Sequence, residues 1–181
     1  DEDTSKHVVQ VLRMKVGEQL NLTDGKGNML TGEIINDHKK HCEVKVTHSQ
    51  FTTYHSHKVT IAISLLKNTN RFEWFLEKAT EIGVSEIIPL ICERTEKEKF
   101  RYARMNQICI SAMLQSQQVW LPLLHEPTEF SKVVEQSVAE QKFIAHCMEG
   151  DRQSLANRQI ITTSHSLIFI GPEGDFTKEE V

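Results

Sequence analysis

Apolar runs and amphipathic segments alternate along the chain from Lys58 onward, and this alternation constrains the fold more than any other feature of the sequence. Residues 59–66 form a nearly continuous apolar run, and residues 70–82 then place an apolar stripe on one side of a helix. The same order recurs in later segments, with strands at 84–92, 143–147 and 167–170 and helices at 101–116 and 130–140. Buried strands that alternate with helices are typical of a parallel sheet with flanking helices. We therefore predict an α/β fold for residues 58–181.

Three residues mark the ends of the first predicted helix. Asn70 can cap its amino end, and Glu73, three residues later, can bond back to the cap in the manner of a capping box. Gly83 supplies the stop, because glycine readily adopts the left-handed conformation in which many helices end. The sequence therefore predicts a helix over 70–82 with well-marked boundaries.

The chain before Lys58 has a different pattern, in which short strands are separated by turns. Three strands are predicted here, at 19–23, 29–35 and 42–47. The glycine-rich segment 24–28 between the first two suits a hairpin. We therefore predict two domains, a small β-barrel or barrel-like domain over residues 1–57 and the α/β domain over residues 58–181.

The composition of the chain bears on its location. The 181 residues have a formal net charge of -4 at pH 7, and the apolar runs are too short to span a membrane. The opening sequence DEDTSK resembles neither a signal peptide nor a transit peptide. The four cysteines lie far apart, as expected for reduced thiols. We therefore predict a cytoplasmic protein with no membrane partner.

Histidines are concentrated in the first predicted domain. Six of the nine lie there, among them His38 and His41 beside Cys42. This group lacks the paired spacings of a zinc finger, and surface histidines that become charged as the pH falls would show the same pattern. We therefore predict no metal site.

A strand that leads into a glycine-rich turn is the most informative local motif. The apolar residues 167–170 are followed by the run GPEG at 171–174, and Thr177 with Glu180 three residues later then predicts a helix. In α/β proteins, ligands bind beyond the carboxyl ends of strands, where glycines let them approach the backbone. The motif thus predicts a ligand site, although a tight turn before a helix cap would look the same. It is neither a P-loop nor a dinucleotide-binding fingerprint, which argues against phosphate chemistry.

Two further polar segments follow predicted strands. Residues 67–71 come after the first α/β strand, with Lys78 and Glu81 two turns later, and residues 93–95 come after the second strand. Arg94 could neutralise an anion or orient a base edge through its planar guanidinium. A solvent-facing charged loop is the alternative for Arg94, and a solvated helix pair is the alternative for Lys78 with Glu81.

Basic residues gather near the start of the chain. His7, Arg13 and Lys15 lie beside the predicted β-domain. A small β-domain with basic groups often holds RNA through its sugar-phosphate backbone. A plain amphipathic segment has the same pattern, so RNA binding is a hypothesis at this point.

The order of these motifs resembles the RsmE family, the ribosomal RNA small-subunit methyltransferase E enzymes of the SPOUT superfamily. The resemblance extends over nearly the whole chain and rests on the blocks HVVQVLRMKVG at 7–17, DGKG at 24–27, Lys67, KATEIGV at 78–84, IPL at 88–90, ERT at 93–95, Gln115 with Ser116, Pro122, and IGPEG at 170–174. The KATEIGV, ERT and IGPEG blocks at these separations are quite specific to the family.

The resemblance implies both a fold and an activity. The fold would be a PUA-like β-barrel RNA-binding domain at 1–57, followed at 58–181 by a SPOUT methyltransferase domain whose parallel sheet contains a trefoil knot. The protein would work as a homodimer. Its activity would be transfer of a methyl group from S-adenosyl-L-methionine to N3 of a uridine in 16S rRNA of the small ribosomal subunit.

The resemblance also implies roles for individual residues. Arg94 would stabilise negative charge on the uracil carbonyl oxygens, and Glu173 would fix the neighbouring loop or contact the substrate, so both are catalytic candidates. The donor would be held by the backbone of one segment, here named the cofactor loop, which consists of Ile170, Gly171, Pro172, Glu173 and Gly174. His7, Arg13 and Lys15 would position the RNA.

Three features depart from the family pattern. The position after Gly174 is usually glycine and here is Asp175, which adds a negative charge and restricts the backbone. An arginine often found after the Gln-Ser pair is replaced by Gln118. The sequence also ends at Val181, before the family's final leucine-glycine and isoleucine-leucine-arginine segment. We therefore expect the knot and the cofactor pocket to be incomplete in this chain.

Two other functions are compatible with the residues taken by themselves. A non-catalytic RNA-binding protein would bind rRNA with a clear salt dependence but would not bind the methyl donor. A small-molecule enzyme would use the same α/β cleft, and its N-terminal domain would serve as an interaction module. Affinity for RNA and for the donor discriminates among the three functions.

Overall fold

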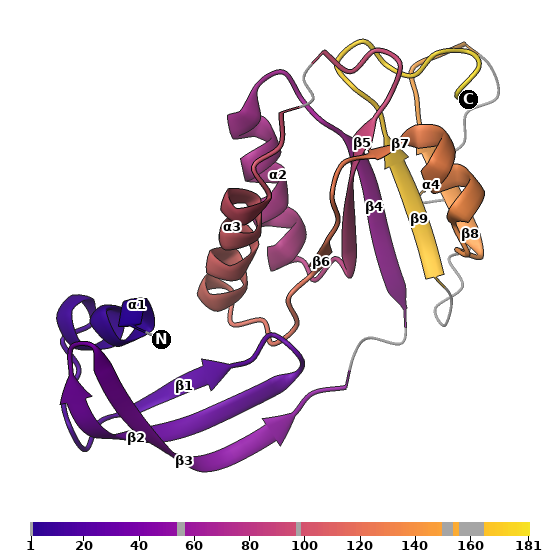
Figure 1. The fold of residues 1–181 in the computed structure, drawn as a ribbon. Helices are drawn as coiled ribbons and strands as arrows, with labels where there is room; N and C mark the ends of the chain where they lie inside the picture. The colour runs from indigo at the N-terminus through magenta and orange to yellow at the C-terminus, as the bar shows by residue number, and fades with distance from the viewer. Residues whose placement is uncertain (1, 54–56, 97–98, 150–153, 156–164) are drawn as a thin grey trace. The chain divides into compact units, whose positions relative to one another are not determined.

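A computed structural model describes residues 2–53, 57–96, 99–149, 154–155 and 165–181. The chain divides into two compact units, residues 1–54 and residues 55–181. Each unit is built around its own β-sheet (Figure 1).

The N-terminal unit is a three-stranded antiparallel sheet preceded by a short helical segment. Its strands pair in the order β1 (Gln19–Thr23), β2 (Asn28–His38) and β3 (His41–Phe51). The helical segment consists of α1 (Glu2–Lys6) and the π-helix η1 (His7–Val11). The Ser5 hydroxyl accepts a hydrogen bond from the backbone N–H of Cys42 at 3.1 Å, which fastens α1 to β3. The three predicted strands are confirmed, and β3 extends beyond the predicted segment at both ends.

Asp24 organises the predicted hairpin loop between β1 and β2. Its carboxylate accepts hydrogen bonds from the side-chain amide of Asn28 at 2.7 Å and from the backbone N–H of Lys26 at 2.8 Å. These bonds lower the pKa of Asp24. Gly25 and Gly27 have φ angles of 69° and 95°, a region that glycine enters without steric cost. The hairpin predicted from this glycine-rich segment is therefore confirmed.

The C-terminal unit contains a parallel sheet. Its strands follow the order β6 (Leu123–Leu124), β5 (Glu86–Ile91), β4 (Lys58–Ser64), β9 (His165–Ile170) and β8 (Gln141–Ala145), and β7 (Thr128–Glu129) also pairs with β5. Every strand pairing recorded for the described part of this sheet is parallel. β4, β5 and β9 match their predicted segments to within two residues. The predicted α/β class is confirmed.

Helices cover both faces of this sheet (Figure 1). They are α2 (Thr69–Glu81), α3 (Tyr102–Gln115) and α4 (Phe130–Gln136). Successive side chains of a strand point to opposite faces of the sheet. In β4, Ile63 therefore belongs to the apolar core with Phe72 of α2, whereas Ala62 belongs to the core with Val133 of α4. None of the described helices is long and apolar enough to cross a membrane.

The amino end of α2 differs from the prediction. Asn68, not Asn70, is the cap, and its side-chain oxygen accepts a hydrogen bond from the backbone N–H of Asn70 at 3.0 Å. Glu73 does not close a capping box, because its carboxylate accepts hydrogen bonds from Nε and Nη2 of Arg104 at 2.6 and 2.9 Å. A bidentate charged pair of this kind is stronger than a neutral bond to the backbone. Gly83, with φ of 82°, ends the helix as predicted.

α4 is shorter than predicted. It ends at Gln136 rather than at residue 140, because Ser137 is extended and its hydroxyl accepts a hydrogen bond from the backbone N–H of Ala139 at 3.2 Å. Serine side chains compete in this way with helical backbone bonds. The following strand, β8, consequently begins two residues before the predicted segment 143–147.

The segment after the cofactor loop is a turn rather than the predicted helix. Residues 178–180 form this turn, and the Glu180 N–H donates to the Thr177 carbonyl oxygen at 3.3 Å. The Glu180 carboxylate accepts a hydrogen bond from the Thr177 N–H at 2.9 Å, which is the glutamate half of the predicted capping box. One backbone bond is too little to offset the entropy cost of nucleating a helix.

The carboxylate of Glu86 is expected to make the stability of the C-terminal unit depend on pH. Burial by itself would raise the pKa of Glu86, but the Lys58 ammonium, 2.5 Å away, lowers it below the usual value. A carboxyl group with a lowered pKa stabilises the fold above its unfolded pKa of about 4.3, and this contribution is lost as the pH falls through the folded pKa. We therefore expect the free energy of unfolding to fall less between about pH 5 and pH 3 in Glu86→Gln than in the unmodified protein. Urea denaturation at several pH values measures this difference. An equally steep loss in the variant would contradict this role.

Candidate functional site

The polar segments predicted from the sequence lie at the carboxyl ends of β4, β5 and β9. Because these strands are parallel neighbours, the loops that follow them meet at one edge of the sheet (Figure 1). The loops consist of residues 65–68, 92–96 and 171–176 and are named here the first, second and third strand-end loops. The third contains most of the cofactor loop.

Glu173 joins the third strand-end loop to the first. Its Oε1 accepts a hydrogen bond from the backbone N–H of Lys67 at 3.1 Å. The Lys67 ammonium forms an ion pair with Glu96 Oε2 at 2.8 Å, and this hydrogen bond raises the pKa of Lys67. This ion pair connects the first and second strand-end loops, and exposed pairs of this kind contribute little to stability.

Arg94 joins the second strand-end loop to the third. Its Nη1 donates to the carbonyl oxygens of Gly174 at 2.7 Å and of Phe176 at 3.3 Å. A Cβ atom at position 174 would lie 3.5 Å from Cδ of Arg94, so the arginine stem runs beside the loop. Arg94 therefore holds the backbone at the end of the cofactor loop through hydrogen bonds.

Glu180 makes a connection that sequence reasoning missed. Its Oε1 accepts a hydrogen bond from the backbone N–H of Glu93 at 3.0 Å, while its Oε2 bonds Thr177. The spacing of Thr177 and Glu180 indicated the second bond. The bond to Glu93 crosses 87 residues, so no local signal could have shown it.

Cys92 is buried at the start of the second strand-end loop. Its backbone N–H donates to Thr95 Oγ1 at 2.8 Å, and that hydroxyl lies 2.9 Å from Ser64 Oγ. Burial raises the pKa of the Cys92 thiol to about 11. Because the thiolate is the nucleophilic form, Cys92 is not suited to attack a substrate at neutral pH.

Gly171 lies where the cofactor loop passes closest to the core. A Cβ atom at this position would lie 3.0 Å from Cδ2 and Cε2 of Phe176 and 3.3 Å from its backbone nitrogen. Phe176 is fully buried, and its ring centroid is 5.3 Å from that of Phe130. The loop is thus folded tightly over Phe176.

We expect Gly171→Ala to lower the free energy of unfolding by about 1–3 kcal/mol, because overpacking a well-packed site has a cost of this size. Urea denaturation measures the change. Gly174→Ala is the matched control, since a Cβ atom there would make only an ordinary contact at 3.5 Å. Equal stability of the two variants would show that close approach to Phe176 is not what requires glycine at position 171.

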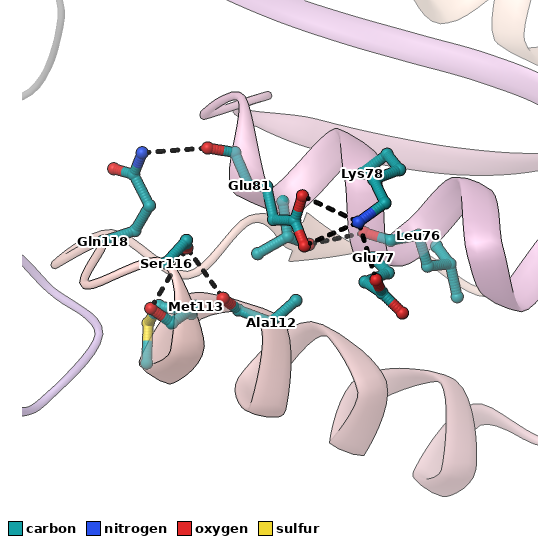
Figure 2. Close-up of polar contacts among 9 residues, drawn as sticks. Leu76, Glu77, Lys78, Glu81, Ala112, Met113, Ser116 and Gln118 are labelled. Carbon is teal, nitrogen blue, oxygen red and sulfur yellow. Dashed lines mark hydrogen bonds and ion pairs between the residues drawn. The ribbon is translucent and has the colours of Figure 1, made fainter.

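A second polar group lies between α2 and α3 (Figure 2). Lys78 Nζ contacts Glu77 Oε1 at 2.8 Å and both carboxylate oxygens of Glu81 at 3.0 Å, and these bonds raise the pKa of Lys78. Gln118 Nε2 donates to the backbone carbonyl oxygen of Glu81 at 3.1 Å. The structure therefore brings the KATEIGV block together with Gln118, and it confirms Lys78 and Glu81 as an ion pair on one helix.

A groove of about 740 Å³ lies beside this polar group. None of its lining residues belongs to a strand-end loop. Its charged lining residues are Glu77, Glu81, Lys78 and Arg104, whose formal charges cancel. RNA phosphates would therefore gain no net attraction there.

The predicted RNA-binding residues all belong to the N-terminal unit, whereas Arg94 and the cofactor loop belong to the C-terminal unit. His7 begins η1, Arg13 has a φ of 58°, and Lys15 Nζ lies 3.5 Å from Asp37 Oδ2. His7, Arg13 and Lys15 are all exposed, as phosphate contacts require.

The histidine group of the N-terminal unit has a simple geometry. The rings of His38 and His41 stack with centroids 5.7 Å apart. Within the part of the chain that the structure describes, no three histidine, cysteine, aspartate or glutamate residues are arranged to hold a metal ion.

Two family models match the chain. Residues 53–181 match the model of an RNA methyltransferase domain, and residues 1–47 match that of an RNA methyltransferase PUA domain. The two matches follow one another in the same order as the two structural units.

Several solved structures are similar over nearly the whole chain. The crystal structure of a probable rRNA-methyltransferase from Porphyromonas gingivalis is 33% identical, with a TM-score of 0.90, and the match covers 99% of this chain and 77% of that one. The crystal structure of ribosomal RNA small subunit methyltransferase E from Neisseria gonorrhoeae, bound to S-adenosyl methionine, is 25% identical with a TM-score of 0.85. That match covers 99% of this chain and 76% of the other.

The curated relatives are also named ribosomal RNA small subunit methyltransferase E. Ribosomal RNA small subunit methyltransferase E of Rickettsia conorii is 23% identical over 97% of this chain and 71% of its own length. The chain spans 55% of the relative from Mesomycoplasma hyopneumoniae and 59% of the relative from Synechocystis. All three relatives are thus longer than the sequence described.

Proposed function

Because this chain belongs to the RsmE family of RNA methyltransferases, we propose that it transfers the methyl group of S-adenosyl-L-methionine to N3 of a uridine in 16S rRNA of the small ribosomal subunit. The observation that carries the proposal is the meeting of the IGPEG and ERT segments at one sheet edge, where Arg94 bonds Gly174. The relatives' names support an rRNA substrate in the small subunit. The N3 position rests on the resemblance of the sequence to the family.

The cofactor loop fits a donor that is held through backbone groups. At Gly171 a Cβ atom would press on Phe176, so the absence of a side chain at this position lets the loop pass close to the core. When bound, S-adenosylmethionine supplies a methyl group already activated by its sulfonium, so alignment is the main task of the protein. Residues 170–174 would hold the donor, while Arg94 and Glu173 hold the loop.

The acceptor side of the reaction develops negative charge that the site must stabilise. N3 of uridine carries a proton and is a poor nucleophile until that proton passes to solvent or to a base, and the negative charge that then remains spreads onto the uracil carbonyl oxygens. Arg94 would stabilise that charge. Its guanidinium has five N–H donors, so the bonds that Nη1 makes to the loop leave a capacity for further contacts. Glu173, already bonded to the Lys67 N–H, acts in this proposal by positioning the loop.

The remaining parts of the proposal concern partners and location. His7, Arg13 and Lys15 would contact RNA phosphates, which position the RNA without reading its sequence. The protein would act as a homodimer. It would work in the cytoplasm, where bacteria assemble the small subunits that carry this RNA.

A bacterial strain that lacks its own enzyme of this family provides the test. Expression of the full-length protein should restore N3-methyluridine in 16S rRNA, measured by nuclease digestion and mass spectrometry of the nucleosides. Methylation of a different atom would refute the N3 assignment. Absence of methylation despite salt-dependent RNA binding by the purified protein would favour a non-catalytic RNA-binding protein instead.

A further inference from the structure

Asp175 occupies a backbone conformation that suits glycine. It follows the cofactor loop directly, and its φ of 60° lies in the left-handed region. Glycine enters this region freely, while aspartate and asparagine are the side-chain-bearing residues that tolerate it best. The chain therefore keeps a carboxylate where the backbone alone would favour glycine, and the bonds of that carboxylate indicate why.

Two backbone donors occupy the carboxylate of Asp175. Its Oδ2 accepts a hydrogen bond from the N–H of Cys147 at 2.7 Å, and its Oδ1 accepts one from the N–H of Phe176 at 2.9 Å. These bonds lower the pKa of Asp175, so the group is ionised at neutral pH. The bond to Phe176 is local, whereas the bond to Cys147 crosses 28 residues to reach the segment after β8.

The bond to Cys147 fastens the third strand-end loop to the segment that follows β8. The strand order β5-β4-β9-β8 puts β9 between β4 and β8. Arg94 follows β5 and Lys67 follows β4, so both reach the loop from one side of β9. Cys147 follows β8 and reaches it from the other side. The loop is thus fixed from both of its neighbouring strands.

We propose that Asp175 is a positioning residue for S-adenosylmethionine, and that its bond to Cys147 holds the cofactor loop in the shape that binds the donor. Its two bonds to backbone N–H groups fasten the carboxylate to the loop and to the segment after β8, so Asp175 acts by positioning the loop. This inference rests on the proposed function, because it names a residue that sets donor affinity in that reaction.

Two substitutions remove the carboxylate while the backbone conformation stays accessible. Asparagine and glycine both tolerate a φ near 60°, so Asp175→Asn and Asp175→Gly lose charge-assisted bonds without added strain. In the full-length protein we expect Asp175→Gly, which removes the bonds to Cys147 and Phe176, to raise the dissociation constant for S-adenosylmethionine about tenfold, the effect expected from losing the charge-assisted bond to Cys147. Asp175→Asn should raise it less, because the amide keeps one acceptor oxygen. Turnover at saturating donor and RNA affinity should stay unchanged in both variants.

Calorimetry with S-adenosylmethionine measures the affinities, and amide hydrogen exchange at Cys147 reports the tether directly. Exchange at Cys147 should be faster in Asp175→Gly than in the unmodified protein. Glu149→Gln is the matched control, since it removes an exposed carboxylate close to Cys147 and should leave both readouts unchanged.

Three outcomes would overturn the inference in distinguishable ways. Unchanged exchange at Cys147 in Asp175→Gly would show that the tether does not exist in solution. Faster exchange with unchanged donor affinity would show that the bond between Asp175 and Cys147 exists but does not contribute to donor binding. If the unmodified protein bound no donor at all, the proposed function would fail, and the positioning role would fail with it whatever the exchange data show.

Discussion

Replacing Arg94 by alanine is expected to lower the turnover number of methyl transfer by about 10²–10³, the usual cost of removing one preorganised donor to developing charge. The substitution removes the bonds from Nη1 to the carbonyl oxygens of Gly174 and Phe176, together with the positive charge at that sheet edge. RNA affinity should change little, because the proposed phosphate contacts belong to the N-terminal unit. Steady-state kinetics with varied RNA and donor concentrations separate the two effects.

Arg94→Lys is the matched control for this prediction. Lysine keeps the charge but cannot hold two carbonyl oxygens with a planar fork. Activity close to that of the alanine variant would mean that the hydrogen bonds of Arg94 to the loop carbonyl oxygens account for most of its contribution to turnover. Activity close to that of the unmodified protein would mean that its positive charge does. A loss of RNA affinity with normal turnover at saturation would refute the role assigned to Arg94.

Phe176→Ala is expected to lower the free energy of unfolding by about 3–5 kcal/mol, the cost of emptying the site of a buried phenylalanine. Phe176 is fully buried, and it supports the cofactor loop at Gly171. Its carbonyl oxygen also accepts a hydrogen bond from Arg94. The cavity left beneath the loop should therefore weaken donor binding as well as stability. Urea denaturation and donor calorimetry measure the two losses.

Two further variants make the prediction for Phe176 specific to the loop. Phe130→Ala removes a ring of the same aromatic cluster that belongs to α4 and not to the third strand-end loop, and the centroid of this ring lies 5.3 Å from that of Phe176. It should reduce stability but retain donor affinity. Phe176→Leu should remain folded and still bind the donor less tightly than the unmodified protein. Unchanged donor affinity in Phe176→Leu would show that this ring does not shape the loop.

Most of the C-terminal fold could be predicted from the sequence because its strands are long apolar runs. β4 and β9 lie in the interior of the sheet, where burial on both faces leaves a continuous apolar signal. The prediction was wrong where other bonds replaced the expected ones. The Glu73 carboxylate binds Arg104 instead of the helix cap, and α4 ends early, just before Ser137, whose hydroxyl accepts a hydrogen bond from the backbone N–H of Ala139.

The candidate site could be located from the sequence, but its contacts could not. Parallel strands place the segments around Arg94 and Glu173 at one edge, which follows from the topology alone. The partners of these side chains are backbone atoms 80 and 106 residues away, and no periodic pattern carries that information. Asp175 stood out as a departure from the family pattern, yet nothing near it in sequence indicated Cys147. The substrate atom came from the resemblance and not from the residues themselves.

Transfer of a labelled methyl group from S-adenosylmethionine to small ribosomal subunits that lack the modification tests the central claim most directly. The assay compares residues 1–181 with a form extended to the length of its relatives, followed by nucleoside analysis of the 16S rRNA. Labelled N3-methyluridine formed by the extended form is the predicted result. Absence of label from both forms, although each is folded and binds RNA, would contradict the account and leave an RNA-binding protein without catalytic activity.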